Sequence, residues 1–209
     1  MPVSDKNGKL QRINQLYHFT AITMSYLKYP SREDYELPKK NVLVISCMDL
    51  RLTDDLMAFL NFDNLENRYD HFILAGASLL CSPKLKKFFA SGCYEQYSNW
   101  KQVQVDHLNL AIALHNIKDV YIVEHENCGA YSSFLDQQHT EVDLSTLKHE
   151  KKTHKKFAST LAREIHDEVR SEINREGEME RYQLGVHSFF IDLRGNVEVL
   201  DTLRAKKLH

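Results

Sequence analysis

Two short strings in this 209-residue chain contain side chains that bind metal ions. One is Cys-Met-Asp-Leu-Arg at residues 47–51, and the other is His-Glu-Asn-Cys-Gly at residues 125–129. Thiolates and imidazoles are the ligands that Zn²⁺ prefers, and a site with three protein ligands keeps one position open for water. Cys47, His125 and Cys128 are therefore candidate zinc ligands. Hydrolytic or hydration chemistry is the function that such a site would support.

Asp49 and Arg51 lie two positions apart in the first string, where they can pair. A bidentate contact between an arginine and a carboxylate is geometrically specific. Held by Arg51, Asp49 could accept a hydrogen bond from a water on the metal and orient it. Released, Asp49 could fill the fourth metal position and close the site. These two are the candidate catalytic residues, and an ordinary surface ion pair, worth under about 1 kcal/mol, is the alternative.

A buried β-strand is predicted immediately before each string. Residues 41–46 (Asn-Val-Leu-Val-Ile-Ser) and 119–124 (Asp-Val-Tyr-Ile-Val-Glu) are short, apolar and rich in β-branched side chains, as in strands buried on both faces. In open α/β sheets, ligands bind beyond the carboxyl ends of the strands. If these two strands are neighbours, the three candidate ligands can converge on one point although they lie far apart in sequence.

The rest of the chain predicts strands that alternate with helices. This alternation indicates right-handed βαβ units and an α/β fold with a mainly parallel sheet. A single domain over residues 1–209 is the simplest organisation, and apolar side chains at helical spacing predict an amphipathic helix at residues 10–28. Further strands are expected at 71–75, 183–192 and 197–200 (the last antiparallel), and helices at 53–60, 83–97, 100–116, 128–135 and 144–175. The helix at 100–116 carries Val103, His107, Leu110, Ala111 and Leu114 on one side.

Composition is that of an ordinary globular protein, with 43% hydrophobic residues, 27% charged residues and a net charge of −2. No basic excess points to nucleic acid, and no apolar run approaches the ~20 residues of a membrane span. Residues 1–12 are polar and lack the apolar region of a secretory signal. We therefore expect a cytoplasmic protein, in which thiols stay reduced and the four cysteines are thiols or ligands.

At these residues the chain resembles the β-class carbonic anhydrases. That family carries Cys-x-Asp-x-Arg after its first strand and His-x-x-Cys-Gly after its third, as residues 47–51 and 125–129 do here. Ala75-Gly76 after the second expected strand and the hairpin with Gly195 at its turn also match.

The resemblance implies a Rossmann-like sheet of four parallel strands plus an antiparallel edge strand, with an N-terminal helical arm. It implies one Zn²⁺ per chain, held by Cys47, His125 and Cys128, and reversible hydration of CO₂ to bicarbonate by hydroxide on the zinc. It further implies a homodimer or a higher homo-oligomer in which the N-terminal helix embraces the partner.

Where the family has an Arg-Asn pair and a following polar residue, this chain has Ile73, Leu74 and Ala77. Relatives of this fold hydrolyse carbon disulfide or carbonyl sulfide with the same ligands, and an apolar pocket would suit those substrates. Two other interpretations remain open. The first is a non-catalytic zinc protein in which the metal locks two loops, and the second is a thiol-redox protein that uses Cys47 and Cys128. Cys81 and Cys93 are interpreted as bystanders.

Overall fold

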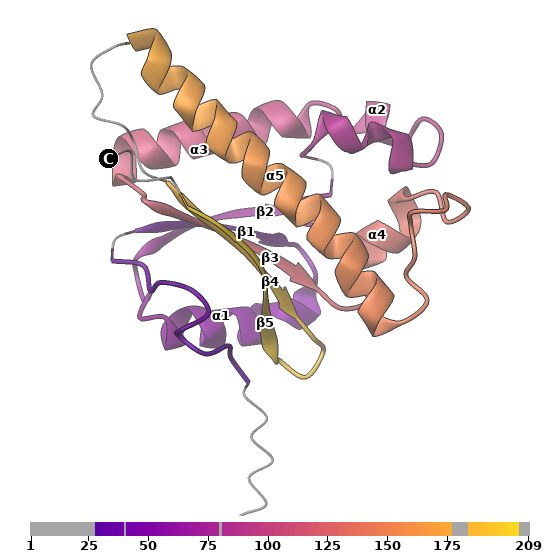
Figure 1. The fold of residues 1–209 in the computed structure, drawn as a ribbon, viewed down its shortest axis with the longest axis horizontal. Coiled ribbons are helices and arrows are strands. Elements are labelled where there is room, and N and C mark those ends of the chain that lie inside the picture. Colours follow the sequence, from indigo (N-terminus) through magenta and orange to yellow (C-terminus); the bar gives the residue numbers. More distant parts are fainter. Residues whose placement is uncertain (1–27, 40, 80, 177–183, 205–209) are drawn as a thin grey trace, which may run out of the picture.

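The computed structural model describes residues 28–39, 41–79, 81–176 and 184–204 (Figure 1). Its centre is a five-stranded sheet with the strand order β2-β1-β3-β4-β5. The first four strands in this order are parallel, and β5 is antiparallel to β4, which confirms the predicted α/β fold class. The strands are β1 (Val42–Cys47), β2 (Tyr69–Leu74), β3 (Asp119–His125), β4 (Gly185–Ile191) and β5 (Val197–Leu203).

Helices cover both faces of the sheet, with α1 on one face and α3 and α5 on the other (Figure 1). The side chains of β1 are buried along its whole length, and those of β3 and β4 are buried beyond the first residue. Continuous apolar strands of this kind belong in the middle of a sheet that is covered on both sides. The helical elements are α1 (Thr53–Phe62), α2 (Cys93–Gln96), α3 (Trp100–His115), α4 (Gly129–Phe134), α5 (Leu147–Glu176) and the short 3₁₀ turns η1 (Leu50–Leu52) and η2 (Pro83–Phe88).

Two apolar layers hold the sheet between its helices. On the α1 side, the Phe59 ring packs against Tyr121 of β3 and Phe189 of β4, with ring centroids 6.2 and 4.9 Å away. On the other side, Ile122 of β3 and Leu161 of α5 belong to a separate buried cluster. The strands β1 and β3 pair directly, so their carboxyl ends lie beside each other. The two apolar layers hold the sheet in this arrangement.

Two expectations about the helices were wrong in detail. Residues 83–97 do not form one helix, because the chain breaks between η2 and α2, where Gly92 takes a left-handed conformation at φ 76°. Helix α3 exists, but the side with Leu110 and Leu114 is not its buried side, and Leu114 is 70% exposed. The buried residues of α3 are Gln104, Val105, Leu108 and Ala111.

Almost all of the helix expected at residues 10–28 lies outside the described residues, so that prediction stays a prediction. Within the described part of the chain, no helix has both the length and the apolar character needed to cross a membrane.

Candidate metal centre

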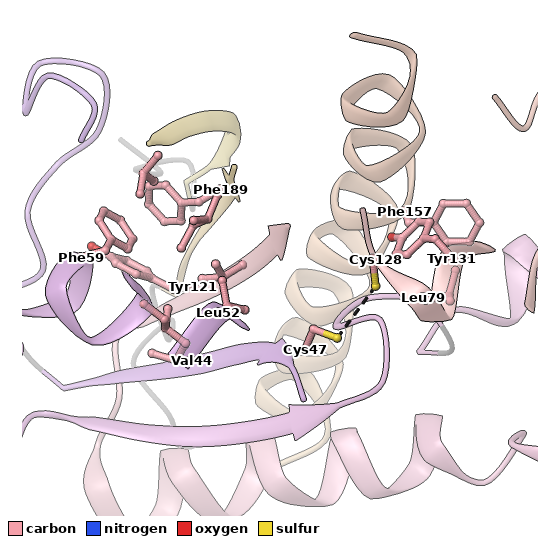
Figure 2. Packing of buried hydrophobic residues seen from close by; sticks show 14 of the residues in the cluster. Val44, Cys47, Leu52, Phe59, Leu79, Tyr121, Cys128, Tyr131, Phe157 and Phe189 are labelled. Atoms are coloured by element: carbon pink, nitrogen blue, oxygen red, sulfur yellow. Dashed lines mark hydrogen bonds between the residues drawn. The ribbon is translucent and has the colours of Figure 1, made fainter. Parts of the chain in front are cut away.

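The structure brings Cys47, His125 and Cys128 together at the carboxyl ends of β1 and β3. One ligand atom from each residue lies within 4.8 Å of the other two, and all three side chains are buried. The two Sγ atoms are 3.9 Å apart and point toward each other from β1 and from the start of α4 (Figure 2). Among the described residues, this is the one group of metal-ligating side chains that converges in this way.

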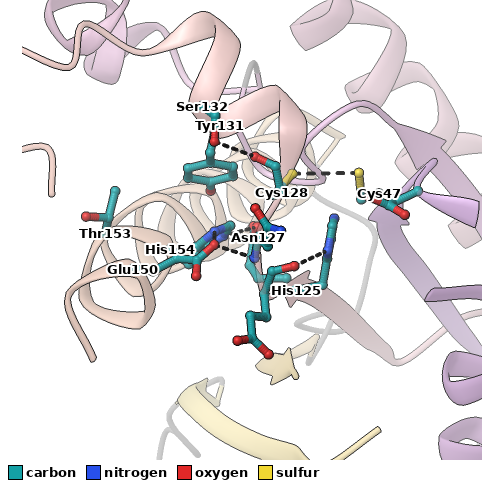
Figure 3. A network of polar contacts seen from close by, with 12 residues as sticks. Cys47, His125, Asn127, Cys128, Tyr131, Ser132, Glu150, Thr153 and His154 are labelled. Carbon is teal, nitrogen blue, oxygen red and sulfur yellow. Dashed lines mark hydrogen bonds and ion pairs between the residues drawn. The ribbon is translucent and has the colours of Figure 1, made fainter. Parts of the chain in front are cut away.

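The His125 ring is oriented for a metal by its own backbone. Its Nδ1 lies 3.0 Å from the carbonyl oxygen of Glu126, which can only accept, so Nδ1 carries the ring proton (Figure 3). Nε2 is then an acceptor, and it is buried with no hydrogen-bond partner among the described residues. An unpaired buried polar atom is costly. A cation beside the two sulfur atoms would satisfy Nε2. In metal-ligating histidines, a hydrogen bond from the other ring nitrogen, like the one from Nδ1 to the Glu126 carbonyl, commonly fixes the ring.

The chain after β2 also contacts the site. The N–H of Gly76 donates a 3.3 Å hydrogen bond to Sγ of Cys47. Gly76 has φ 78°, and a Cβ there would lie 2.8 Å from the Cβ of Leu79. Only glycine therefore fits the turn that aims this N–H at the sulfur.

The two thiols are coupled electrostatically. The hydrogen bond from Cys128 lowers the pKa of Cys47 to about 4, with further help from His125 and the Gly76 N–H and against the opposing effect of burial. The same hydrogen bond and burial raise the pKa of Cys128. Ionisation of Cys47 is therefore favoured over that of Cys128, and a divalent cation bound here would displace the protons of both thiols.

Asp49 and Arg51 form the predicted pair. Nε and Nη2 of Arg51 donate to the two carboxylate oxygens of Asp49 at 2.9 and 2.7 Å, and the Arg51 N–H donates to Oδ1 at 3.0 Å. The hydrogen bond from the Arg51 side chain is the main reason that the pKa of Asp49 lies well below its usual range. Asp49 is outside the group of converging ligand atoms. Its carboxylate is engaged by Arg51 instead.

Cys81 and Cys93 do not join the metal cluster. Cys81 is fully buried, and burial raises the pKa of its thiol to about 12. Such a thiol is a small apolar core residue with little thiolate character.

A buried polar network behind the ligands was not anticipated from the sequence. Side chains alternate along β3, so Glu124 points to the opposite face from His125, toward α5. Glu124 accepts hydrogen bonds from the Ser78 N–H at 3.2 Å, from the Ser78 hydroxyl, and from Nδ1 of His154 at 2.8 Å. Glu124 and His154 are both fully buried. The sequence signal was Glu124, an acidic residue directly after the apolar interior of the strand.

Glu150 extends this network to the loop between β3 and α4. Its carboxylate accepts a 2.6 Å hydrogen bond from the N–H of Asn127 and lies 3.6 Å from Nε2 of His154 (Figure 3). Burial lowers the pKa of His154, but its contacts with Glu124 and Glu150 outweigh burial and raise it overall. Burial raises the pKa of Glu150, and its contacts with His154 and with the backbone of Asn127 and Cys128 lower it below its usual range. The two carboxylates therefore favour the protonated form of His154 at this buried position.

Exposed apolar side chains lie beside the candidate ligands. Met48 and Leu50, on either side of Asp49, are exposed, and the Leu50 side chain is 85% exposed. Leu193, also exposed, lines a small hollow together with Arg51 and His125. Arg51, Asp55 and Asp192 line the same hollow, so both charged and apolar side chains face a small molecule that enters it.

The donor set fits zinc. Two sulfurs and one imidazole nitrogen are the ligands of catalytic zinc sites that keep an open position. The unpartnered Nε2 of His125 and the 3.9 Å between the sulfurs are the observations that support this fit.

No family model matches the chain. An uncharacterised protein of Rickettsia bellii is 29% identical over 162 residues, which is 78% of this chain and 82% of that protein. An uncharacterised protein of Rickettsia conorii is 27% identical over 162 residues, which is 78% of this chain and 73% of that protein.

Several similar solved structures are β-carbonic anhydrases. The Coccomyxa enzyme in complex with acetazolamide has a TM-score of 0.49 and 16% identity, covering 78% of this chain and 73% of that chain. The enzyme CafD of Aspergillus fumigatus has a TM-score of 0.47 and 12% identity, and the match covers 82% of this chain and 92% of that chain. One of the tetrameric enzymes of Sordaria macrospora has a TM-score of 0.40 and 18% identity, covering 83% and 85%. At these scores and identities, the matches record a similarity and assign no family.

Proposed function

We propose that this chain is a zinc enzyme of the carbonic anhydrase type, which catalyses the reversible hydration of CO₂ to bicarbonate. The observation that carries the proposal is the buried group of Cys47, His125 and Cys128, with ligand atoms within 4.8 Å of one another and an unpartnered Nε2 on His125. The paired Asp49 and Arg51 beside this group give the second support. When bound, zinc would supply a Lewis acid that lowers the pKa of water to about 7.

The chain's own residues have distinct tasks in this proposal. Cys47, His125 and Cys128 would hold the metal. Asp49 would accept a hydrogen bond from the attacking water and thereby orient a lone pair toward the carbon of CO₂. Arg51 would keep Asp49 ionised and fixed, since its guanidinium occupies both carboxylate oxygens. Hydration of CO₂ yields bicarbonate and one proton, which must leave to solvent.

A stopped-flow assay of CO₂ hydration with a pH indicator tests the proposal directly. The full-length chain is loaded with one equivalent of zinc, and chelated protein serves as the blank. We expect turnover well above the uncatalysed rate that disappears on chelation. Full zinc occupancy without any hydration activity would contradict the proposal.

A second candidate is hydrolysis of carbonyl sulfide or carbon disulfide at the same site. It is favoured by the exposed Met48, Leu50 and Leu193 around the site, because these linear substrates are more apolar than bicarbonate. Sulfide release from carbonyl sulfide, measured on the same zinc-loaded protein, distinguishes the two. Zinc binding without activity on either substrate would leave the non-catalytic zinc protein, in which the metal locks the loops after β1 and β3.

We also propose a cytoplasmic homodimer or a higher homo-oligomer. Exposed apolar side chains on α3, among them Leu110 and Leu114, would be covered in such an assembly. Light scattering coupled to size-exclusion chromatography tests this, and a monomer at micromolar concentration would contradict it.

A further inference from the structure

The first turns of α5 are hydrogen-bonded to the loop that carries two of the three candidate ligands. Glu150 accepts a 2.6 Å hydrogen bond from the N–H of Asn127 and interacts with the backbone of Cys128. Asn127 lies between His125 and Cys128 and takes a left-handed conformation at φ 55°. The Glu150 carboxylate therefore holds the backbone from which both ligands project.

Glu150 is in turn held by a buried histidine one helical turn further on. Nε2 of His154 lies 3.6 Å from Oε1 of Glu150, and its Nδ1 contacts Oε2 of Glu124 at 2.8 Å. The imidazole also packs against the Tyr131 ring, with centroids 3.7 Å apart and an interplanar angle of 32°. Because His154 is fixed on several sides, the carboxylate of Glu150 is pre-organised to face the amides of the ligand loop.

The same network reaches the third ligand through Ser78. Glu124 binds the N–H and the hydroxyl of Ser78. Two residues earlier, the N–H of Gly76 donates to Sγ of Cys47. Helix α5 is thus connected to the loop after β2, which contacts Cys47, and to the loop after β3, which leads to Cys128.

We propose that Glu150 is a positioning residue for the metal site, so that metal binding and docking of the start of α5 stabilise each other. This inference rests on the proposed metal site. Residues that orient metal ligands typically change metal affinity 10- to 100-fold when mutated. Coupling between two sites is reciprocal, so a metal that needs this helix start must also stabilise it.

Zinc affinity of the full-length chain tests the proposal. Glu150→Gln keeps the size of the side chain and removes its charge, and Glu150→Asp keeps the charge and withdraws it by one methylene. Glu168→Gln is the matched control, because it lies on the same helix about five turns away. Each protein is stripped of metal and titrated with zinc in competition with a chromogenic chelator. Each is also loaded with Co²⁺ to record the absorption bands that report tetrahedral thiolate coordination.

We expect both Glu150 variants to bind zinc at least about 10-fold more weakly than wild type, with weakened or shifted cobalt bands. The Glu168→Gln protein should match wild type in both respects. If Glu150 is purely structural, its substitution will lower the melting temperature of the metal-free protein and leave zinc affinity and the cobalt spectrum unchanged. That result would overturn the proposal. A wild-type chain that binds no zinc would instead overturn the proposed function, and this inference with it.

Hydrogen exchange of the wild-type protein keeps the proposal testable if the variants fail to fold. Zinc should slow exchange of the amides of Asn127 and Cys128 and also of the first two turns of α5. Protection confined to the loop, with no change in α5, would show that helix and metal are uncoupled and would overturn the inference.

Discussion

The guanidinium of Arg51 donates a 2.9 Å hydrogen bond to the carbonyl oxygen of Asn127. This contact joins the loop after β1 to the loop after β3, while the same guanidinium holds Asp49. One side chain therefore sets the distance between the candidate catalytic carboxylate and the two ligands on the second loop.

Replacing either cysteine ligand should abolish zinc retention. In Cys47→Ala and Cys128→Ala, two ligands remain, which is too few for a tight site. Zinc present at about 1,000 times its dissociation constant stabilises a fold by about 4 kcal/mol, so the variants should lose stabilisation of that order. Metal content and thermal melting with and without zinc measure both effects. Cys93→Ala is the control, and normal zinc content in either ligand variant would refute the assignment.

Asp49→Asn should keep zinc and lose turnover. An amide cannot accept the hydrogen bond in the same way as a carboxylate, and loss of a positioned proton acceptor typically costs about 100-fold or more. Stopped-flow CO₂ hydration at equal zinc content measures the effect, with Asp54→Asn as a control on the next helix. Turnover equal to that of wild type would exclude Asp49 from catalysis.

Arg51→Lys should impair turnover more than metal binding. Lysine keeps the charge but lacks the planar fork that engages both oxygens of Asp49 and the Asn127 carbonyl at once. A misplacement of about 1 Å in a catalytic group can cost roughly 100-fold. The comparison of kcat with zinc affinity in the same preparation checks this, and a proportional loss of both would point to a structural role instead.

Asp63→Asn should change how stability depends on pH. Asp63 is buried and accepts hydrogen bonds from the hydroxyls of Tyr35 at 2.7 Å and Tyr121 at 2.9 Å. Burial raises its pKa, although the tyrosine hydrogen bonds oppose the rise. Folded protein then binds this proton more tightly than unfolded protein. The contribution of this proton to the free energy of unfolding is complete below the ordinary pKa of aspartate, about 3.9. It is lost as pH rises through the raised pKa of Asp63.

Urea unfolding of wild type and Asp63→Asn between pH 4 and pH 8 measures this contribution. The free energy of unfolding of wild type, minus that of the variant, should fall as pH rises. Asp34→Asn, at an exposed position, should show no such trend. A difference that grows with pH would mean that the pKa of Asp63 is lowered by folding.

The strands could be predicted from the sequence because their signal is local. Apolar β-branched runs such as residues 42–46 are long enough to identify a strand that is buried on both faces. The carboxyl end of each such strand then indicates where the candidate metal ligand lies. The buried side of α3 was harder, because its apolar residues surround the helix. Leu108 and Leu110 are equally apolar, yet Leu108 is buried and Leu110 is exposed.

The network behind the metal site could not be predicted in the same way. Glu124 and His154 are thirty positions apart, and their hydrogen bond exists only because α5 crosses the sheet at that point. The spacing of Glu150 and His154 on one helical face was visible in the sequence. The same spacing is equally typical of a solvated helix face. Only the burial of Glu150 and His154 in the structure distinguishes a buried network from such a face.

Ser78 has a consequence for how this chain can change over evolution. Its N–H and hydroxyl bind Glu124, two residues after the Gly76 N–H that donates to the Cys47 sulfur. An insertion or deletion between Gly76 and Ser78 would shift this N–H relative to the sulfur. The length of this short segment is therefore constrained, and the stretch that follows is constrained in sequence as well, because Leu79 and Phe88 belong to the core.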